Sequence, residues 1–251
     1  MPPTADEILL ANLAATRFPS LSVDVALTHT FHGGPSVSAK SRTLSRFEAT
    51  PDGRWKFDIM SRVTEGQPFN GRFLIEQRSG GSASPLTWVL DPTRGAARQY
   101  AYQPWQPFAG SALRWMDYII PPPGTFTAAL NPGATPSDPT WVLPAPCWVV
   151  DLTLDRSFWK PEPRLERLWI EQTPGRALDH RVEQHLSDGS VRVIGAANWA
   201  QFKPGGPWGP TLRTVDDPVV DTRTMIAVVS AYANPLDPRL FDPITMAEQD
   251  W

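Results

Sequence analysis

Hydrophobic and polar residues alternate along much of this chain, most clearly over residues 54–59. Three apolar and three charged residues take turns in this segment: Arg54, Trp55, Lys56, Phe57, Asp58 and Ile59. Because successive side chains of a strand point to opposite sides of a sheet, the pattern predicts a strand with one apolar side. Similar alternation predicts strands over 21–28, 38–48, 72–78, 86–91, 147–154, 164–171, 177–186, 190–197, 210–216 and 222–232.

Two segments predict helices instead. Thr4 and Glu7 have the spacing of a capping box at the start of an amphipathic helix over 4–16. Ser111 is a suitable cap for a short helix over 111–120. The proline-rich segment 124–146 reads as a long irregular loop, a length typical of lids. About ten strands and two short helices indicate a mainly β chain forming a barrel or a strongly curved sheet.

Composition narrows the function classes. The chain has 251 residues, 28 of them proline and 11 tryptophan, and its net charge is -3. Long helices are therefore disfavoured, and so is nucleic-acid binding, which needs clustered basic residues. Its length suits one all-β domain, and we expect residues 1–251 to form one. No apolar run reaches the roughly 20 residues needed to cross a bilayer.

Catalytic motifs are missing from the sequence. It contains no G-x-S-x-G, H-E-x-x-H, C-x-x-C or phosphate-binding glycine loop. Within the pairs His29/His32 and His180/His185, the odd spacing assigns the two rings to opposite sides of a strand, which disfavours a metal site. Cys147 has no adjacent cation, so we expect a buried, inert thiol. The sequence therefore predicts a protein that is not an enzyme and that uses no cofactor.

The order of several short motifs resembles that of the LolA-like outer-membrane lipoprotein-sorting proteins. Segment 108–118, FAGSALRWMDY, is similar to the family's F-x-G-S-D-F-S-Y-E-D-L, although Ala112 replaces an acidic residue. Trp115 stands for the aromatic residue of that motif. Further similar segments follow in the family's order: 148–152, 168–171, 187–189, 232–234 and 236–241.

The resemblance implies an incomplete antiparallel β-barrel, shaped like a half-pipe, with an α-helical lid across its hydrophobic concave side. It implies a periplasmic carrier that binds lipid or acylated lipoprotein, with the signal peptide absent from this sequence. The residues alone leave a cytoplasmic location open. We expect a monomer that exchanges cargo with an inner-membrane transporter.

The predicted cavity is lined by the aromatic side of the sheet. Tryptophan is enriched where an apolar surface is partly wet, although any single one can instead fill a closed core. The expected ligand-binding residues are Trp55, Phe57, Ile59, Phe73, Trp88, Trp115, Trp148 and Met225. The expected lid residues are Ser111, Leu113, Met116 and Asp117.

Two arginines offer a way to close such a lid. We expect Arg42 or Arg46 to bond to lid backbone around 111–117, the alternative being two ordinary surface arginines. Two other function classes stay open. One is a sensor or adaptor that docks on a membrane transporter or an envelope-stress regulator. The other is a hydrolase on the concave side, for which the sequence offers no convincing nucleophile and base.

Overall fold

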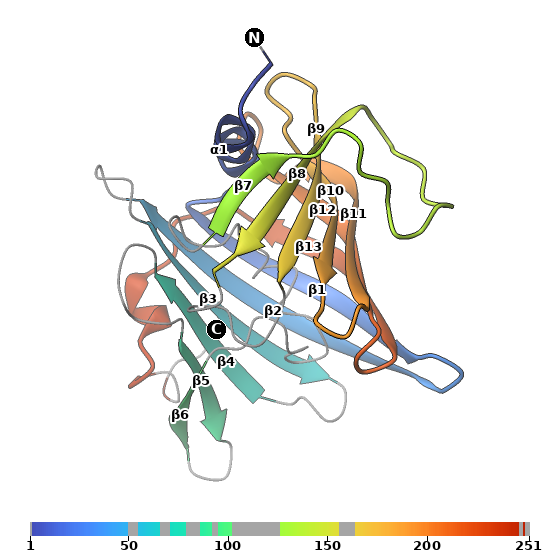
Figure 1. The fold of residues 1–251 in the computed structure, drawn as a ribbon. Coiled ribbons are helices and arrows are strands. Elements are labelled where there is room, and N and C mark those ends of the chain that lie inside the picture. The colour runs from blue at the N-terminus through green and yellow to red at the C-terminus, as the bar shows by residue number, and fades with distance from the viewer. Residues whose placement is uncertain are drawn as a thin grey trace. The chain divides into compact units, whose positions relative to one another are not determined.

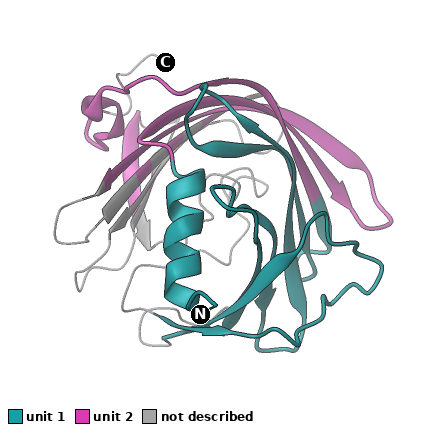
Figure 2. Ribbon diagram, turned by 90° about the horizontal axis from the view of Figure 1, so that it is seen from above, with its two compact units in different colours: residues 1–17, 123–223 teal, residues 18–122, 224–251 magenta. Residues whose placement is uncertain are grey.

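The fold was analysed in a computed structural model that describes residues 2–49, 55–65, 71–78, 86–91, 95–101, 126–155, 164–245 and 248. The chain forms two compact units (Figure 2). Unit 1 comprises residues 1–17 and 123–223, and unit 2 comprises residues 18–122 and 224–251. The prediction that residues 1–251 form a single domain stays a prediction.

In its described residues, unit 1 contains one helix and six strands, each strand paired antiparallel with the next in sequence (Figure 1). The elements are α1 (Ala5–Thr16), β7 (Phe126–Leu130), β8 (Cys147–Leu154), β9 (Leu165–Glu171), β10 (Asp179–His185), β11 (Val191–Gln201) and β12 (Trp208–Asp217).

One side of the unit 1 sheet is apolar and well buried. The register aligns five aliphatic residues in a single cross-strand row, all of them 0% exposed: Val150, Leu168, Val182, Ile194 and Val215. Burying such a side chain stabilises a fold by about 1.5–3 kcal/mol. This row and its neighbours Leu152 and Ile170 define what we call the apolar side of unit 1.

Helix α1 begins at the predicted capping box. The Thr4 hydroxyl accepts a hydrogen bond from the Glu7 backbone N–H, and the Thr4 N–H donates to the Glu7 carboxylate at 2.7 Å. Ile8, Leu9 and Asn12 are buried. The Asn12 amide donates to the Ala177 carbonyl at 2.7 Å and to the Asp179 carboxylate at 3.3 Å. The helix is thereby fixed to the start of β10.

The described residues of unit 2 form seven strands in the order β6-β5-β4-β3-β2-β1-β13, and the chain returns to this unit within β13. Its elements are β1 (Ser20–Phe31), β2 (Ser36–Ala49), β3 (Trp55–Glu65), β4 (Gly71–Arg78), β5 (Leu86–Asp91), β6 (Ala96–Ala101), β13 (Thr222–Tyr232, of which the first two residues belong to unit 1) and the 3₁₀ helix η2 (Pro238–Phe241).

The fold class predicted from the sequence is confirmed: the chain is mainly β with short helices, and neither unit closes its sheet into a barrel. Every predicted strand is present, and its ends agree within four residues except in β3, which continues to Glu65 where the prediction ended at Ile59. The predicted helix over 111–120 lies outside the described residues. None of the helices in the described ranges combines the length and hydropathy needed to cross a membrane.

Two strands were missed, and the prediction of irregular structure throughout 124–146 is wrong. β7 (Phe126–Leu130) lies inside that segment and pairs with β8. β7 contains two alanines and β6 contains three, and both lack a run of alternating large apolar residues. Alanine has a low strand propensity, so backbone pairing with a neighbouring strand decides the conformation of both segments.

Replacing Ile8 by Ala should lower the free energy of unfolding by about 2–5 kcal/mol, because Ile8 lies on the buried face of α1 and is only 4% exposed. The matched control is Leu10→Ala on the same helix, where Leu10 is 65% exposed and a change within about 0.5 kcal/mol is expected. Urea denaturation measures both variants. Equal losses would contradict the docking of α1 through its Ile8 face.

Candidate functional site

The strand register brings four of the predicted ligand-binding positions to one side of the unit 2 sheet. Ile59 pairs with Ser45, which pairs with Leu21. Positions 55, 57, 59 and 61 are each two residues apart along β3, so they share one side of the sheet. Phe73 pairs with Ser61 and therefore belongs to the same side. The β1 residues on this side are at most 6% exposed: Leu21, Val23, Val25 and Leu27. These four residues define the apolar side of unit 2, which includes positions 55, 57, 59 and 73.

Strand β2 contributes small hydroxyl side chains to this apolar side. Ser41, Thr43 and Ser45 are 2%, 1% and 1% exposed. The Ser45 hydroxyl donates to the Leu21 carbonyl at 3.4 Å, which satisfies it without water. Ser45 thus lies between Leu21 and position 59, so a small residue separates two larger aliphatic ones in this cross-strand row.

Trp88 lies on the opposite side of the same sheet. It pairs with Leu74, which pairs with Met60, and Met60 pairs with Leu44. Trp88 packs against the buried cluster of Leu44, Met60 and the η2 residue Phe241. The register therefore separates Trp88 from positions 55, 57, 59 and 73.

The remaining predicted ligand-binding residues are dispersed. Trp148 is half-buried on β8 and pairs with Ile170, on the apolar side of unit 1. Met225 on β13 is 44% exposed. Trp115 and the lid residues Ser111, Leu113, Met116 and Asp117 lie outside the described residues.

Both predicted lid-contacting arginines bind carboxylates. Arg42 donates to Asp24 through Nε at 2.7 Å and through Nη2 at 3.2 Å, and this pair lowers the pKa of Asp24. Arg46 donates to Asp58 at 2.9 Å and also to Glu48, and its guanidinium lies 5.7 Å from the centre of the Phe241 ring. Their contact with a lid stays a prediction, since residues 111–117 are outside the described ranges.

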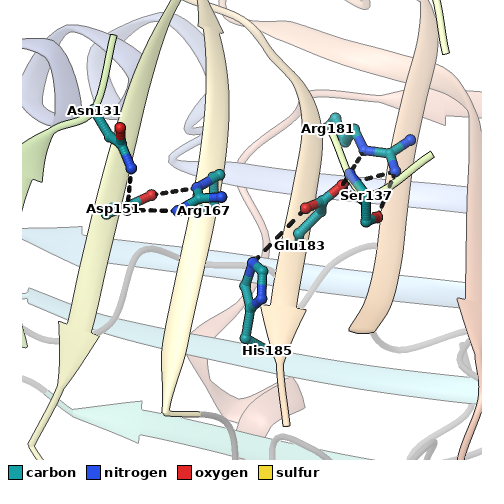
Figure 3. Close-up of polar contacts among 7 residues, drawn as sticks. All are labelled: Asn131, Ser137, Asp151, Arg167, Arg181, Glu183 and His185. Carbon is teal, nitrogen blue, oxygen red and sulfur yellow. Dashed lines mark hydrogen bonds and ion pairs between the residues drawn. The ribbon is translucent and has the colours of Figure 1, made fainter. Parts of the chain in front are cut away.

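The other side of the unit 1 sheet has a polar cluster that the sequence did not predict (Figure 3). Asp151, Arg167 and Glu183 stand in one cross-strand row on β8, β9 and β10. Arg167 donates to Asp151 at 2.6 and 2.8 Å, and Asn131 donates to the same carboxylate at 2.8 Å. The alternation within each strand does not show which residues of neighbouring strands stand opposite each other. The row was therefore not predictable without the pairing of β8, β9 and β10.

The segment 131–146 is fastened across this polar side. The Ser137 backbone N–H and hydroxyl donate to Glu183 at 2.8 and 2.7 Å, and Arg181 donates to Glu183 at 2.8 Å. The rings of Trp141 and Trp169 meet edge to face, with 5.8 Å between their centres. The Arg181 guanidinium lies 4.9 Å from the centre of the Trp141 ring. We call residues 131–146 the strap.

The cluster lacks the geometry of a hydrolytic triad. The Ser137 hydroxyl bonds to Glu183, and His185 lies beyond that carboxylate at 3.7 Å. A serine nucleophile requires the imidazole, not the carboxylate, as its direct partner. Glu183 is 1% exposed and accepts three hydrogen bonds, which indicates a structural role. No group of three potential metal ligands occurs within the part of the chain that the structure describes.

Burial and neighbouring charges shift two pKa values in this cluster. Burial alone would raise the pKa of Asp151, but hydrogen bonds from Arg167 and Asn131 lower it below its ordinary value. Burial lowers the pKa of His185, and the positive charge of Arg167 acts in the same direction. The nearby carboxylates of Glu183 and Asp151 oppose the shift of His185 without reversing it.

Cys147 is half-buried at the start of β8, and its thiol donates to the Ala145 carbonyl at 3.3 Å. Burial, assisted by the negative charge of Glu171, raises the pKa of the thiol to about 12. Because only the thiolate is a strong nucleophile, the raised pKa disfavours reaction of Cys147 at neutral pH, and the predicted inertness stays a prediction.

Replacing His185 by Gln should make stability less sensitive to acid just below pH 6.5, roughly the ordinary pKa of histidine. A lowered pKa means that the folded state binds this proton more weakly than the unfolded state. Stability is therefore lost as the pH falls from that value toward the lower folded pKa. Urea titrations of wild type and variant at several pH values measure the slope.

The control is His32→Gln, at an exposed histidine in the β1–β2 turn. Equal slopes for His185→Gln and wild type would contradict the shift.

A thiol reagent such as dithionitrobenzoate should modify Cys147 much more slowly in the native protein at pH 8 than in denaturant, since a pKa of about 12 leaves very little thiolate. The measurement follows absorbance of the released thionitrobenzoate. Rapid reaction of the folded protein would show that the thiol is more acidic or more exposed than the structure indicates.

Comparison of the chain with known proteins identifies its fold. No protein-family model and no curated protein sequence matches the chain. Among solved structures, the chain is similar to a putative outer membrane lipoprotein-sorting protein domain from Vibrio parahaemolyticus, with 12% identity, 97% of each chain covered and a TM-score of 0.78. A DUF1329 family protein from Desulfovibrio piger has 13% identity, 94% and 95% coverage and a TM-score of 0.74.

A LolA superfamily protein from Nitrosomonas europaea has 16% identity to the chain and a TM-score of 0.67, with 96% of this chain and 98% of that chain covered. At such identities a likeness shows the fold alone. The resemblance noted in the sequence is confirmed at that level: the chain has the fold of LolA-like proteins.

Proposed function

We propose that this protein is a carrier that binds the acyl chains of a lipid or a lipoprotein non-covalently and moves them through the periplasm toward the outer membrane. The observation behind the proposal is the apolar side of unit 2, where Leu21, Val23, Val25 and Leu27 alternate along β1 and positions 55, 57, 59 and 73 share their side. The similar solved structures include a putative lipoprotein-sorting domain and a LolA superfamily protein, which supports the same function.

The small residues of β2 favour this use of the sheet. A cross-strand row made only of large aliphatic residues would fill the space above it with its own side chains. Ser41, Thr43 and Ser45 occupy less volume than the residues around them, and their buried hydroxyls need few partners. Because these three positions are at most 2% exposed, an acyl chain in the proposed complex reaches them only after the part of the chain that covers them moves aside.

Burial of hydrocarbon provides the binding energy. Each buried CH₂ contributes about 0.8 kcal/mol, so a long acyl chain gains roughly 10 kcal/mol before the costs of ordering. No covalent step is required, and a carrier must also release its cargo. The predicted lid over Ser111, Leu113, Met116 and Asp117 would then close over the acyl chain and open at low cost.

The carrier proposal includes a periplasmic location, a monomeric state and an inner-membrane transporter as loading partner. A non-enzymatic sensor or adaptor is the competing function, and cargo measurements separate the two. Lipid that co-purifies with the protein and is identified by organic extraction and mass spectrometry supports the carrier. A protein that arrives empty and rejects fluorescent fatty acids contradicts it.

Replacing Ile59 by Asn should weaken binding of a fluorescent fatty acid about tenfold, because a polar group then faces the acyl chain. The matched control is Leu44→Ala, which removes apolar volume from the other side of the same sheet, where Leu44 is 4% exposed against Phe241. Fluorescence titration gives both dissociation constants, and thermal melts give both stabilities.

Undiminished affinity in Ile59→Asn would contradict the proposed lining. Equal weakening in both variants would attribute the effect to stability and would also contradict it. Transfer of a fluorescent lipid between donor and acceptor vesicles tests the transport step separately from binding.

A further inference from the structure

A single carboxylate oxygen anchors the middle of the strap. Oε1 of Glu183 accepts three hydrogen bonds: from the Ser137 backbone N–H at 2.8 Å, from the Ser137 hydroxyl at 2.7 Å and from Nε of Arg181 at 2.8 Å (Figure 3). Nη2 of Arg181 also donates to the Ser137 hydroxyl at 3.1 Å. None of these bonds uses the other carboxylate oxygen, Oε2. The position of Oε1 therefore decides whether Ser137 stays on the sheet.

Arg181 links this oxygen to a second contact of the strap. Its guanidinium lies 4.9 Å from the centre of the Trp141 ring and 5.9 Å from that of Trp169. The next two strap residues, Val142 and Leu143, are 82% and 47% exposed, so they contribute little packing. Polar bonds and ring stacking around Arg181 therefore hold this part of the strap. Segments with few buried apolar contacts open locally at a lower free-energy cost than a packed core.

His185 faces the unused oxygen of Glu183. The distance from its Nε2 to Oε2 is 3.7 Å, which is too long for a hydrogen bond. Nε2 is buried and has no hydrogen-bond partner among the described residues. Buried polar atoms without a partner are rare in folded proteins. A movement of about 1 Å would give both atoms a hydrogen bond of ordinary length.

The surroundings of His185 keep its ring neutral at pH 7. The other positions of its cross-strand row carry no charge: Thr153, Leu165 and Val191. The adjacent row contains the charges that act on it: Asp151, Arg167 and Glu183. Burial lowers the pKa of His185 and the charge of Arg167 adds to that shift, against the opposing effect of the two carboxylates.

The remaining ionisable groups on these elements have partners of their own. At the β12 end of the adjacent row, Asp216 lies 3.6 Å from Arg223. In the strap, Asp138 accepts hydrogen bonds from the Thr140 N–H and hydroxyl at 2.9 and 2.6 Å. Among the described residues of this cluster, His185 is therefore the side chain whose charge changes near neutral pH.

We propose that His185 is an acid-operated latch: when its ring takes up a proton, it draws Glu183 away from Ser137 and the strap leaves the sheet. A protonated imidazole donates from both nitrogens, and charge-assisted bonds of this kind are about 2.7–2.9 Å long. Because Oε1 and Oε2 belong to one rigid carboxylate group, a shift of Oε2 toward His185 moves Oε1 away from Ser137.

Proton binding sets the direction of this switch. While the strap is closed, the lowered pKa means that His185 holds a proton more weakly than a solvated ring does. An open strap that lets the ring reach water binds the proton more tightly, so acid favours the open strap. The effect begins near pH 6.5, roughly the ordinary pKa of histidine. One proton can raise the open population at most about tenfold between about pH 7.5 and about pH 5.5.

The test is hydrogen exchange of the full chain, followed by mass spectrometry from about pH 7.5 to about pH 5 and corrected for the intrinsic pH dependence of exchange. Wild-type amides in the strap should exchange several-fold faster at about pH 5.5 than at about pH 7.5. About 0.5 M urea should leave strap exchange unchanged, because local opening exposes little surface. Amides in β9, which exchange through unfolding, should respond to the urea.

Replacing His185 by Gln should remove the acid-induced rise in strap exchange, because glutamine takes up no proton. The matched control is His29→Gln in unit 2, where burial also lowers the pKa of a half-buried histidine. The rise should persist in this control. A rise that is absent in wild type, that persists in His185→Gln or that is lost equally in His29→Gln overturns the proposal.

The wild-type profile decides even if His185→Gln does not fold. A rise that begins only below about pH 5, where carboxylates titrate, overturns the latch. Strap exchange that is as slow as that of β9 and equally sensitive to urea also overturns it, because the strap would then open only through unfolding. None of these measurements uses lipid, so failure here and failure of the carrier function are distinguishable.

Discussion

Antiparallel register is the constraint on which this structure depends, because it decides which alternate residues share a side. In unit 1 the register aligns Val150, Leu168, Val182, Ile194 and Val215 in one fully buried row. In unit 2 it aligns the aliphatic residues of β1 with the small residues of β2. A shift of one residue would move each set to the other side of its sheet. Strong burial on one side therefore specifies the pairing of every neighbouring strand.

The antiparallel register also places charged and polar side chains where water is excluded, and those next to the aliphatic row of unit 1 bond to one another. Next to the aliphatic row of unit 1, Gln184 donates to Glu166 at 2.6 Å, and Arg192 donates to Gln184 at 3.0 Å and to Asp217 at 2.7 Å. Arg192 and Asp217 are 2% and 1% exposed. A buried pair of this kind adds little net stability, but removal of one partner leaves an uncompensated charge that costs about 3–5 kcal/mol. Such a chain of bonds disfavours any register that separates its members.

Period-2 alternation made the strands predictable, and the Thr4–Glu7 spacing did the same for the start of α1. Alternation says which residues of one strand share a side, but it does not say which residue of the next strand stands opposite. For that reason Trp88 was grouped with Phe73, from which the register separates it, and the Asp151–Arg167–Glu183 row was not foreseen. The strap is stabilised by contacts between residues about 45 positions apart, such as Ser137 and Glu183, and no local pattern reports those.

In strands β2, β3 and β4, one register determines which residues lie on each of the two sides of the sheet. Odd positions such as 43, 59 and 73 belong to the apolar side, and even positions such as 42, 62 and 72 belong to the other side. An irregularity in the β2–β3 pairing falls next to Ser41, where Lys40 pairs with Glu65 instead of continuing the regular step. A bulge of this kind adds one residue and changes the alternation beyond it. The regular pairing from Ser41 onward therefore keeps the apolar positions of β1 and β2 and the charged position of Arg42 on separate sides of the same sheet.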